Sequence, residues 1–414
     1  SIRFDGGSVR INPFRVELGP DRSAITMDVT ADGWIPAAFD STAPPPQLRL
    51  ALDAEPLDLD ALLGPSESGY APLFFARLRD RAIGGRSAEA IAEELGLGLP
   101  ALPNVDARID ARFDRLVRNG LTYNDLTALA RITPSAVTLE QLRFGLMGGV
   151  VDASAELRPL TTDTAGVPLW TLLEARYGVT GVGSGPFFDT LTPFKGHLGG
   201  DFDLAGTVGM VLDRVALPQR RSLEADGTAA ISQGRLTAWA VLDAVGERLG
   251  VATFDTLRFR DWAARFHVEG TRVTLDETAM DASVLTLQAG GWFDLSGQID
   301  VQATAALAPE LARQAGIGQQ LLAAAPDKRV PVGFRIHGGV ENPSVALDLS
   351  PVREQVTGRA TEAVEEVAGE AEDRAREAAR QAEETVRDAA GEAAEEVRGR
   401  LEAGLQDAAD RATG

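Results

Sequence analysis

The stretch LTLQAGGWFDLSGQIDVQATAAL, residues 285–307, alternates between apolar and polar positions from end to end. Its odd positions are all apolar or glycine, and most of its even positions are polar. A period of two predicts β-strands with one apolar face and one wet face. The apolar residues of both halves fall at odd-numbered positions. A loop with an odd number of residues keeps them on the same face, so we expect a three-residue loop around Gly297 that sets Phe293 beside Val301.

Similar alternation, interrupted by Asp and Gly turn residues, predicts strands over most of residues 1–60 and again between residues 105 and 350. Apolar residues at three- and four-residue spacing predict helices in four places. These helices are expected near residues 70–97, 168–177, 236–250 and 309–325. Ser87, followed by Glu89, is the expected N-cap of the second helix in the first of these regions.

Three parts follow from this pattern. Residues 1–221 are expected to form a β-rich segment with the helical insert near 70–97, and residues 222–350 a second β unit with helices near 236–250 and 309–325. Residues 351–414 contain no aromatic residue and repeat Ala and Val every eleven residues, which predicts an acidic helical tail with a narrow apolar stripe. Two interpretations of this tail stay open: a solvated or partly disordered segment, or a helix that lies on a membrane or a partner.

The chain has a formal net charge of −21, only two lysines and no cysteine. Such a surface repels nucleic acid phosphates, so no nucleic acid partner is expected. Acidity of this kind fits either a saline habitat or a particular set of partners. No apolar run approaches 18 residues, which predicts no transmembrane segment, and because the sequence opens at Ser1 we expect a membrane anchor in a preceding part of a longer chain.

No group of residues in the sequence matches a known catalytic, metal-binding or nucleotide-binding motif. Three histidines lie far apart without metal spacing: His197, His267 and His337. The GVGSG run at 181–185 is typical of a glycine-rich turn, because Pro186 follows where a nucleotide-binding helix would begin. Asp58 is expected to point outward from a strand and Asp60 to cap a helix. We therefore expect no catalytic residue, no metal and no cofactor, and hence not an enzyme; an unrecognised hydrolase site would need convergent carboxylates.

Several segments resemble the AsmA-like family of bacterial envelope proteins, which includes TamB- and YhdP-type members, mainly through the C-terminal region of that family. The resemblance covers most of residues 1–350 and lies in the order of the pieces, with small residues at the turns. It is carried by LDLDALLG, GLTYNDLTALARITPSAVTLEQLRFGLMGGVVDASAELRPL, LEADGTAAISQGRLTAWAVLDAVGERLG, FHVEGTRVTLDETAMDASVLTLQAGGWFDLSGQIDVQA and VPVGFRIHGGVENPSVALDL.

The resemblance implies a mainly β fold with a few helices, in which a long, twisted antiparallel sheet curls into an open groove of the bridge-like lipid transfer type. It also implies a periplasmic protein, anchored in the inner membrane in its full length. Such a protein would take part in phospholipid transport between the inner and outer membranes and in outer-membrane biogenesis, with phospholipid acyl chains in the groove. The candidate lining residues are apolar: Val137, Leu139, Leu142, Phe144, Leu285, Leu287, Phe293, Leu295, Ile299 and Val301.

A second hypothesis is a non-catalytic assembly factor that supports outer-membrane protein insertion through contacts with envelope proteins, by strand addition at an open sheet edge. The two hypotheses differ in what lies on the apolar face of the sheet. An open face favours lipid, whereas a face filled by the protein's own helices favours the assembly factor.

Overall fold

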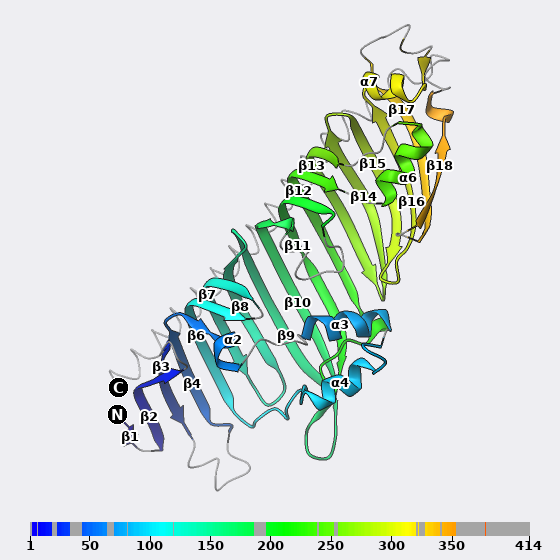
Figure 1. Cartoon of the computed structure of the whole chain (residues 1–414). Helices are drawn as coiled ribbons and strands as arrows, with labels where there is room; N and C mark the ends of the chain where they lie inside the picture. The colour runs from blue at the N-terminus through cyan, green and yellow to red at the C-terminus, as the bar shows by residue number, and fades with distance from the viewer. Residues whose placement is uncertain are drawn as a thin grey trace.

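The computed structural model describes residues 2–5, 7–18, 23–33, 44–63, 70–80, 82–118, 120–185, 196–237, 240–251, 256–319, 322, 328–339, 342–352 and 377. These residues form a mainly β protein in which 18 strands make one long sheet. The strands lie side by side along the long axis, so the molecule is elongated (Figure 1). Nearly all of the predicted tail, 351–414, lies outside the described residues.

The strands follow one another along the chain. They are β1 (Ile2–Asp5), β2 (Ser8–Leu18), β3 (Ser23–Asp32), β4 (Gln47–Ala54), β5 (Leu57–Asp58), β6 (Asp106–Arg118), β7 (Leu121–Ile132), β8 (Val137–Leu146), β9 (Gly149–Thr162), β10 (Pro168–Gly183), β11 (Leu198–Asp213), β12 (Glu224–Thr237), β13 (Thr256–Glu269), β14 (Arg272–Ala282), β15 (Leu285–Asp294), β16 (Gln298–Leu307), β17 (Val330–Gly339) and β18 (Asn342–Asp348).

From β1 to β4 and from β6 to β18, each strand pairs antiparallel with the next. The exception is β6, which pairs in parallel with β4 and with the short β5. The expectation of an entirely antiparallel sheet is therefore wrong at this point, and the sheet is mixed. A parallel pair needs a crossover that returns the chain to the other end of the strands, and residues 59–105 provide it.

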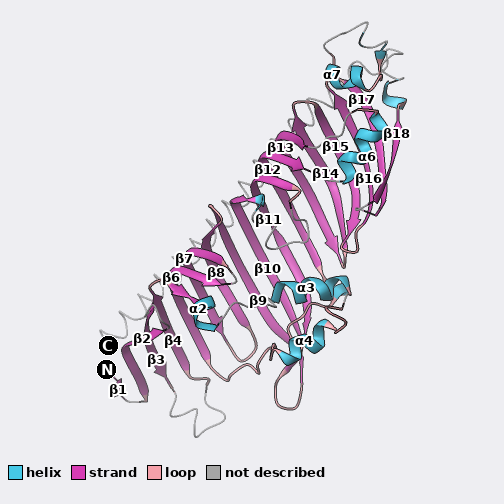
Figure 2. Ribbon diagram, in the orientation of Figure 1, coloured by secondary structure: helices cyan, strands magenta, loops and turns pink. Residues whose placement is uncertain are grey.

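The crossover contains α2 (Leu59–Leu63), α3 (Tyr70–Arg79) and α4 (Ala88–Glu94). The helical pair predicted at 70–97 is confirmed, and Ser87 caps α4 as expected, with its Oγ accepting a hydrogen bond from the Ala90 N–H at 3.1 Å. Figure 2 shows α3 and α4 near one end of the middle strands, well away from α2. Their apolar residues pack on Val215 and Leu217, which follow β11. The crossover thus reaches several strands beyond the pair that it connects.

Two further helices lie over the C-terminal strands: α6 (Ala240–Leu249) and α7 (Pro309–Gln314) (Figure 2). They fall within the regions predicted near 236–250 and 309–325. A short 3-10 turn, η1 (Arg220–Ser222), precedes β12.

The helix predicted at 168–177 is wrong, because these residues begin the strand β10. Leu169, Leu172 and Leu173 imitate helical spacing, but the residues from Thr171 to Val179 also alternate as a strand does. Both edges of β10 are paired, with β9 and with β11, so from Trp170 onward this stretch lies between two strands of the sheet. Tertiary pairing overrides the local pattern here.

The turn between β15 and β16 confirms the odd loop predicted from parity, although the register differs from the expected one by two residues. The loop is Leu295–Gly297, so Phe293 pairs with Ile299 and not with Val301. The Asp294 carboxylate sets this geometry, because its Oδ1 accepts hydrogen bonds from the backbone N–H groups of Ser296 and Gln298, both at 2.9 Å. Gly297 has a φ of +92°, which favours glycine at this position.

Candidate functional site: the apolar face of the sheet

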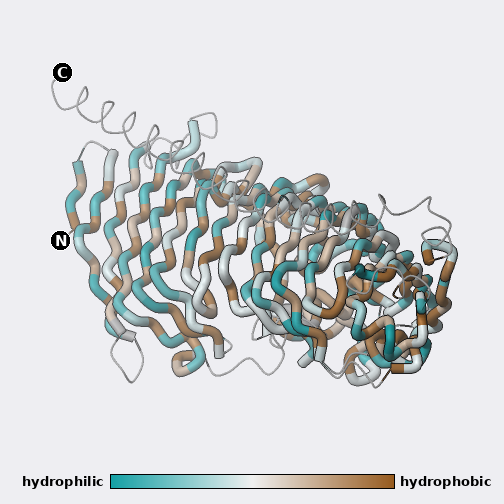
Figure 3. Tube along the Cα trace, turned by 90° about the horizontal axis from the view of Figure 1, so that it is seen from above, coloured by the Kyte–Doolittle hydropathy of each residue, from teal (hydrophilic) through white to brown (hydrophobic). Residues whose placement is uncertain are grey.

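One face of the sheet is apolar along its whole length. A single row of directly paired residues crosses the sheet from one edge to the other, and every member is apolar or glycine. The row is Ile2, Ile11, Val29, Leu50, Ile109, Ala130, Leu139, Ala155, Ala175, Val208, Ala225, Val268, Val273, Phe293, Ile299, Gly338 and Pro343. We call the face that carries this row the apolar face and the opposite face the polar face; Figure 3 shows the matching alternation of hydropathy along the strands.

Bulges keep the apolar residues on this face where the sequence parity changes. In β8, Leu139 pairs with Ala155 and Leu142 pairs with Ala153, with a register shift between them. Leu139 and Leu142 are three residues apart, so in a regular strand they would face opposite sides. The bulge turns both toward the apolar face, and a similar shift occurs in β14 between Leu275 and Thr278.

The first group of candidate lining residues, Val137, Leu139, Leu142 and Phe144, lies together on the apolar face of β8. All four are half-buried, and none belongs to a hydrophobic cluster of the described residues. The Phe144 ring packs edge-on against the ring of Tyr123, with 5.3 Å between centroids. No described helix covers this group.

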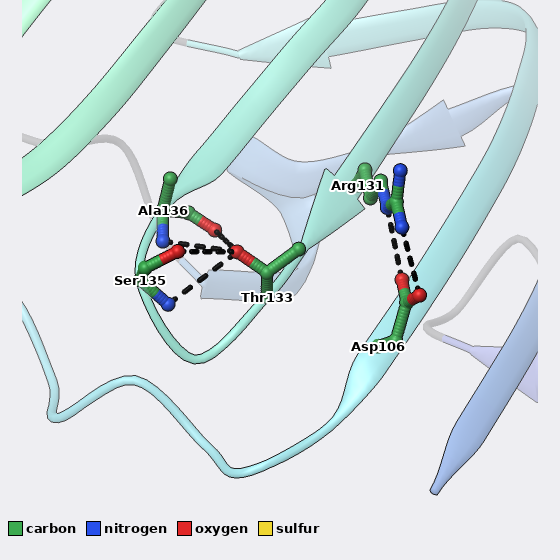
Figure 4. A network of polar contacts seen from close by, with 5 residues as sticks. All are labelled: Asp106, Arg131, Thr133, Ser135 and Ala136. Carbon is green, nitrogen blue, oxygen red and sulfur yellow. Dashed lines mark hydrogen bonds and ion pairs between the residues drawn. The ribbon is translucent and has the colours of Figure 1, made fainter. Parts of the chain in front are cut away.

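Polar contacts at the strand ends fix the position of β8. Thr133 in the β7–β8 turn accepts a hydrogen bond at Oγ1 from the Ala136 N–H at 3.1 Å (Figure 4). Beside this turn, Arg131 on β7 binds both carboxylate oxygens of Asp106 on β6, at 2.9 and 2.8 Å. Arg131 holds the pKa of Asp106 below its usual value through this hydrogen-bonded contact. The turn and the ion pair set where Val137 begins its strand.

The second group of candidate residues has a different environment. Leu285, Ile299 and Val301 are buried in one cluster, and Leu287 and Phe293 pack against it. The helices α6 and α7 supply Val241, Leu249, Leu311 and Ala312 to the same cluster. Leu295 lies apart from them in the β15–β16 turn, where it packs near residues of α3. The apolar face of β15–β17 is therefore covered by the protein's own helices.

Exposure changes along the apolar face. Ile2, Phe4 and Phe14 expose 62%, 79% and 51% of their surface, whereas Leu307 and Val332 are fully buried. Among the described residues, no residue of β1–β8 belongs to any of the four hydrophobic clusters. We call the part over β1–β8, which lies outside these clusters, the uncovered part and the part packed by α6 and α7 the covered part; small residues of the uncovered part, such as Ala107 and Ala111, are nevertheless buried. The two groups of candidates lie on these two parts of one continuous face.

Aromatic side chains on neighbouring strands come close to three glycines in the middle of the apolar face. A Cβ placed on Gly234 would lie 2.0 Å from Phe259, one on Gly227 would lie 2.6 Å from Phe266, and one on Gly206 would lie 2.9 Å from the Tyr177 hydroxyl. Burial, together with the negative charge of Asp226, raises the pKa of Tyr177 to about 12. Glycine at these positions lets large rings cross neighbouring strands without rising far above the sheet.

Two buried hydroxyls interrupt the apolar character of this face. Thr171 pairs with Leu212, and Thr278 pairs with Ala289, so both belong to the apolar face. Their Oγ1 atoms are buried and have no hydrogen-bond partner among the described residues.

A hollow of about 600 Å³ lies mainly on the polar face, over β12–β18. Its lining includes small residues such as Ala263, Ala279 and Gly333, together with the arginines Arg265 and Arg335. Arg335 forms an ion pair with Asp300 at 3.4 Å. The hollow is open and its lining is mixed in polarity.

The two carboxylates considered as a candidate pair in the sequence, Asp58 and Asp60, have separate structural roles. Asp58, and not Asp60, caps the helix, since its Oδ1 accepts the Ala61 N–H at 2.8 Å. Asp60 instead accepts the Gly120 N–H at 2.8 Å and binds Arg118, which ties α2 to the β6–β7 turn. The expected role of Asp60 as the cap is therefore wrong: the helix begins at Leu59, two residues earlier than the cap assignment required.

The three histidines occupy separate positions. His197 Nδ1 lies 3.1 Å from the Thr237 carbonyl oxygen, His267 Nδ1 lies 2.8 Å from Asp226 Oδ1, and His337 lies within β17. Within the described ranges, His, Asp and Glu form no group of three that could hold a metal ion. In the same ranges, no helix has both the length and the apolar character needed to cross a membrane.

Comparison with known proteins gave no further assignment: no family model matches the chain, and searches of curated proteins and of solved structures returned no match.

Proposed function

We propose that the apolar face binds phospholipid acyl chains and that the protein is a periplasmic lipid-binding groove. In this role it takes part in phospholipid transport between the inner and outer membranes and in outer-membrane biogenesis. The observation that carries the proposal is the uninterrupted apolar row from β1 to β18, which over β1–β8 lies outside the hydrophobic clusters of the described residues and exposes Ile2, Phe4 and Phe14, although small residues such as Ala107 and Ala111 are buried. Soluble proteins rarely expose a large continuous apolar surface without a ligand or partner to cover it.

The dimensions of the sheet support this ligand. Neighbouring strands are about 4.8 Å apart, so the face of β1–β9 extends for roughly 35 Å along the long axis. The hydrocarbon layer of one membrane leaflet is about 15 Å thick, so an acyl chain fits within that length. Each buried methylene contributes about 0.8 kcal/mol, so a long acyl chain needs no directional contact to stay bound. The polar headgroup would lie toward the strand ends.

The AsmA-like resemblance supports the same proposal, because it implies a groove of this build between the two membranes. The curl of the sheet into a groove, the inner-membrane anchor in a longer chain and the periplasmic location are parts of the proposal. Acyl chains are the ligand proposed for the uncovered part, where Val137, Leu139, Leu142 and Phe144 lie. The covered part would close the groove near β15–β18.

Native mass spectrometry with lipid extraction tests the proposal on the full chain. The test variant is Leu139→Glu/Phe144→Glu, which places two carboxylates on the uncovered apolar face. The matched control, Thr127→Glu/Gln141→Glu, adds the same charge to the polar face of the same region. We expect phospholipid to co-purify with the parent and the control and to be lost from the test variant while its circular dichroism spectrum is unchanged. A folded parent without lipid would overturn the proposal.

The second candidate function is the non-catalytic assembly factor. Two observations favour it: α6 and α7 fill the apolar face at the C-terminal end, and β18 pairs only with β17 among the described strands. An open sheet edge can accept a strand from another protein. A lipid-free, fully folded parent in the experiment above would favour this function.

A further inference from the structure

Arginines form a row across the polar face at the N-terminal end of the sheet. Arg3 pairs with Arg10, Arg10 with Thr30, and Thr30 with Arg49. The row continues, since Arg49 pairs with Arg108 and Arg108 pairs with Arg131. Five of the six strands from β1 to β7, leaving out the short β5, therefore place an arginine in one line. We call Arg3, Arg10, Arg49 and Arg108 the arginine row.

The arginine row has no ion-pair partner among the described residues. Arg131 beside it binds Asp106, but the four arginines of the row are exposed and form no hydrogen bond or salt bridge with a described side chain. Like charges placed directly opposite each other on a sheet are destabilising. The chain as a whole has a net charge of −21, so this row is a local concentration of positive charge on an acidic protein. Negative charge placed against the row would reduce the repulsion between its arginines.

Carboxylates flank the arginine row without pairing with it. Asp5, Asp32 and Asp106 lie in the next row toward the strand ends, and Asp28 and Asp110 lie in the next row inward. Side chains two residues apart along a strand are separated by about 7 Å, so these carboxylates reduce the repulsion but do not bind the guanidinium groups. The outward-facing donors of the row stay available to an acidic partner.

We propose that the acidic C-terminal segment of the same chain, residues 353–414, binds the arginine row. This segment carries 17 acidic and nine basic residues, a net charge of −8. Its acids recur at helical spacing along one side: Glu362, Glu366, Glu370, Asp373, Glu377, Glu384, Asp388, Glu395 and Glu402. One helical turn rises about 5.4 Å, which is close to the ~4.8 Å between strands, so successive carboxylates can meet successive arginines.

The chain is long enough for this contact. The 62 residues span about 93 Å even when wholly helical, and the 17 strands on the path from β18 to β1 span roughly 80 Å. A tethered segment also has a high effective concentration at its site. External polyanions, including anionic membranes and nucleic acids, are repelled by the net charge of the chain. The covalently attached acidic segment is therefore favoured over them as the partner.

The absence of cysteine allows a direct distance measurement. Spin labels on Ala51→Cys, on the polar face of β4, and on Ala394→Cys, in the acidic segment, report their separation by double electron–electron resonance in the full chain. We expect one narrow, short-distance population in the parent, its loss in Arg10→Glu/Arg49→Glu, and its return when Glu395→Arg/Glu402→Arg is added, because these two acids lie at the helical distance from β18 that matches β4 and β2. Rising salt should remove the same population from the parent, which gives a readout that needs no variant.

The matched control is Arg176→Glu/Arg258→Glu, which reverses two exposed arginines of the polar face that lie outside the row and form no ion pair with a described residue, and it should leave the distance unchanged. Dilution with unlabelled protein must not change the population, because the contact is within one chain. The proposal is overturned if the parent lacks the narrow population or if Arg10→Glu/Arg49→Glu keeps it. It is also overturned if phosphatidylglycerol vesicles bind the parent through the arginine row, since the partner is then a membrane. None of these outcomes depends on lipid in the apolar face.

Discussion

The ring of Phe259 occupies the space where a side chain on Gly234 would lie: a Cβ on Gly234 would sit 2.0 Å from the ring. The two residues pair directly across β12 and β13 on the apolar face. We expect Gly234→Ala to lower the free energy of unfolding by about 1–3 kcal/mol, because the ring must move within a packed cluster. Urea denaturation measures this change. Gly209→Ala is the control, since nothing lies within 4 Å of its Cβ, and it should be neutral or slightly stabilising.

The ion pair between Asp106 and Arg131 predicts a dependence of stability on pH. Arg131 lowers the pKa of Asp106 in the folded protein, so the pair stabilises the fold above the ordinary aspartate pKa of about 3.8, and this stability is lost as pH falls through the lowered value. The side chains are 31% and 39% exposed, so the contribution is about 0.5 kcal/mol. A double-mutant cycle of Asp106→Asn and Arg131→Gln should give this coupling at pH 7 and none at pH 2. Equal coupling at both pH values would contradict the assignment.

The Asp294 carboxylate organises the β15–β16 turn. Burial raises its pKa, but hydrogen bonds from the Ser296 hydroxyl and from backbone N–H groups outweigh burial, and the pKa is lowered. We expect Asp294→Ala to lower the free energy of unfolding by about 1–2 kcal/mol at pH 7 and by less under acid conditions, where the carboxylate is protonated. Ser296→Ala removes only the hydroxyl donor at 2.6 Å and should have the smaller effect in the same denaturation experiment. The reverse order would show that the backbone contacts do not hold the turn.

Tyr177 should titrate last among the three tyrosines. Burial and the Asp226 charge raise its pKa from 10 to about 12, so the folded protein keeps the phenol neutral where an unfolded chain would lose the proton. The stability that this neutral phenol contributes is complete below pH 10 and falls as pH rises toward 12. Ultraviolet absorbance at alkaline pH follows the ionisation, and Tyr177→Phe should remove the highest transition. If that transition remains, the late tyrosine is a different one.

Much of the sheet could be predicted from alternation, since side-chain period alone predicts a two-faced ribbon at residues 285–307 and an odd loop between its strands. The bulge between Leu139 and Leu142 could not be predicted, because it depends on the partner strand β9 and not on local sequence. The helix predicted at 168–177 is wrong because Leu169, Leu172 and Leu173 fit both periods, and only pairing on both edges decides between helix and strand.

For the candidate site, the sequence predicts which residues are apolar but not which of them are covered. The apolar identity of Phe144 and Phe293 was evident from the sequence, and both lie on the apolar face. Their different exposure was not evident, because it depends on where α6 and α7 pack. A helix that follows β12 and another that follows β16 return to cover the same cluster, and no short-range pattern specifies that contact.

The crossover between β5 and β6 also affects how the molecule folds. Most strands touch only their neighbours in sequence, so the sheet alone would resemble a linear array that can open from either end. The helices α3 and α4 instead join the N-terminal strands to the end of β11, where Glu93 binds Arg214 at 2.7 Å. Strand-by-strand unravelling from β1 would have to break this distant contact, so the crossover links the two halves into one cooperative folding unit.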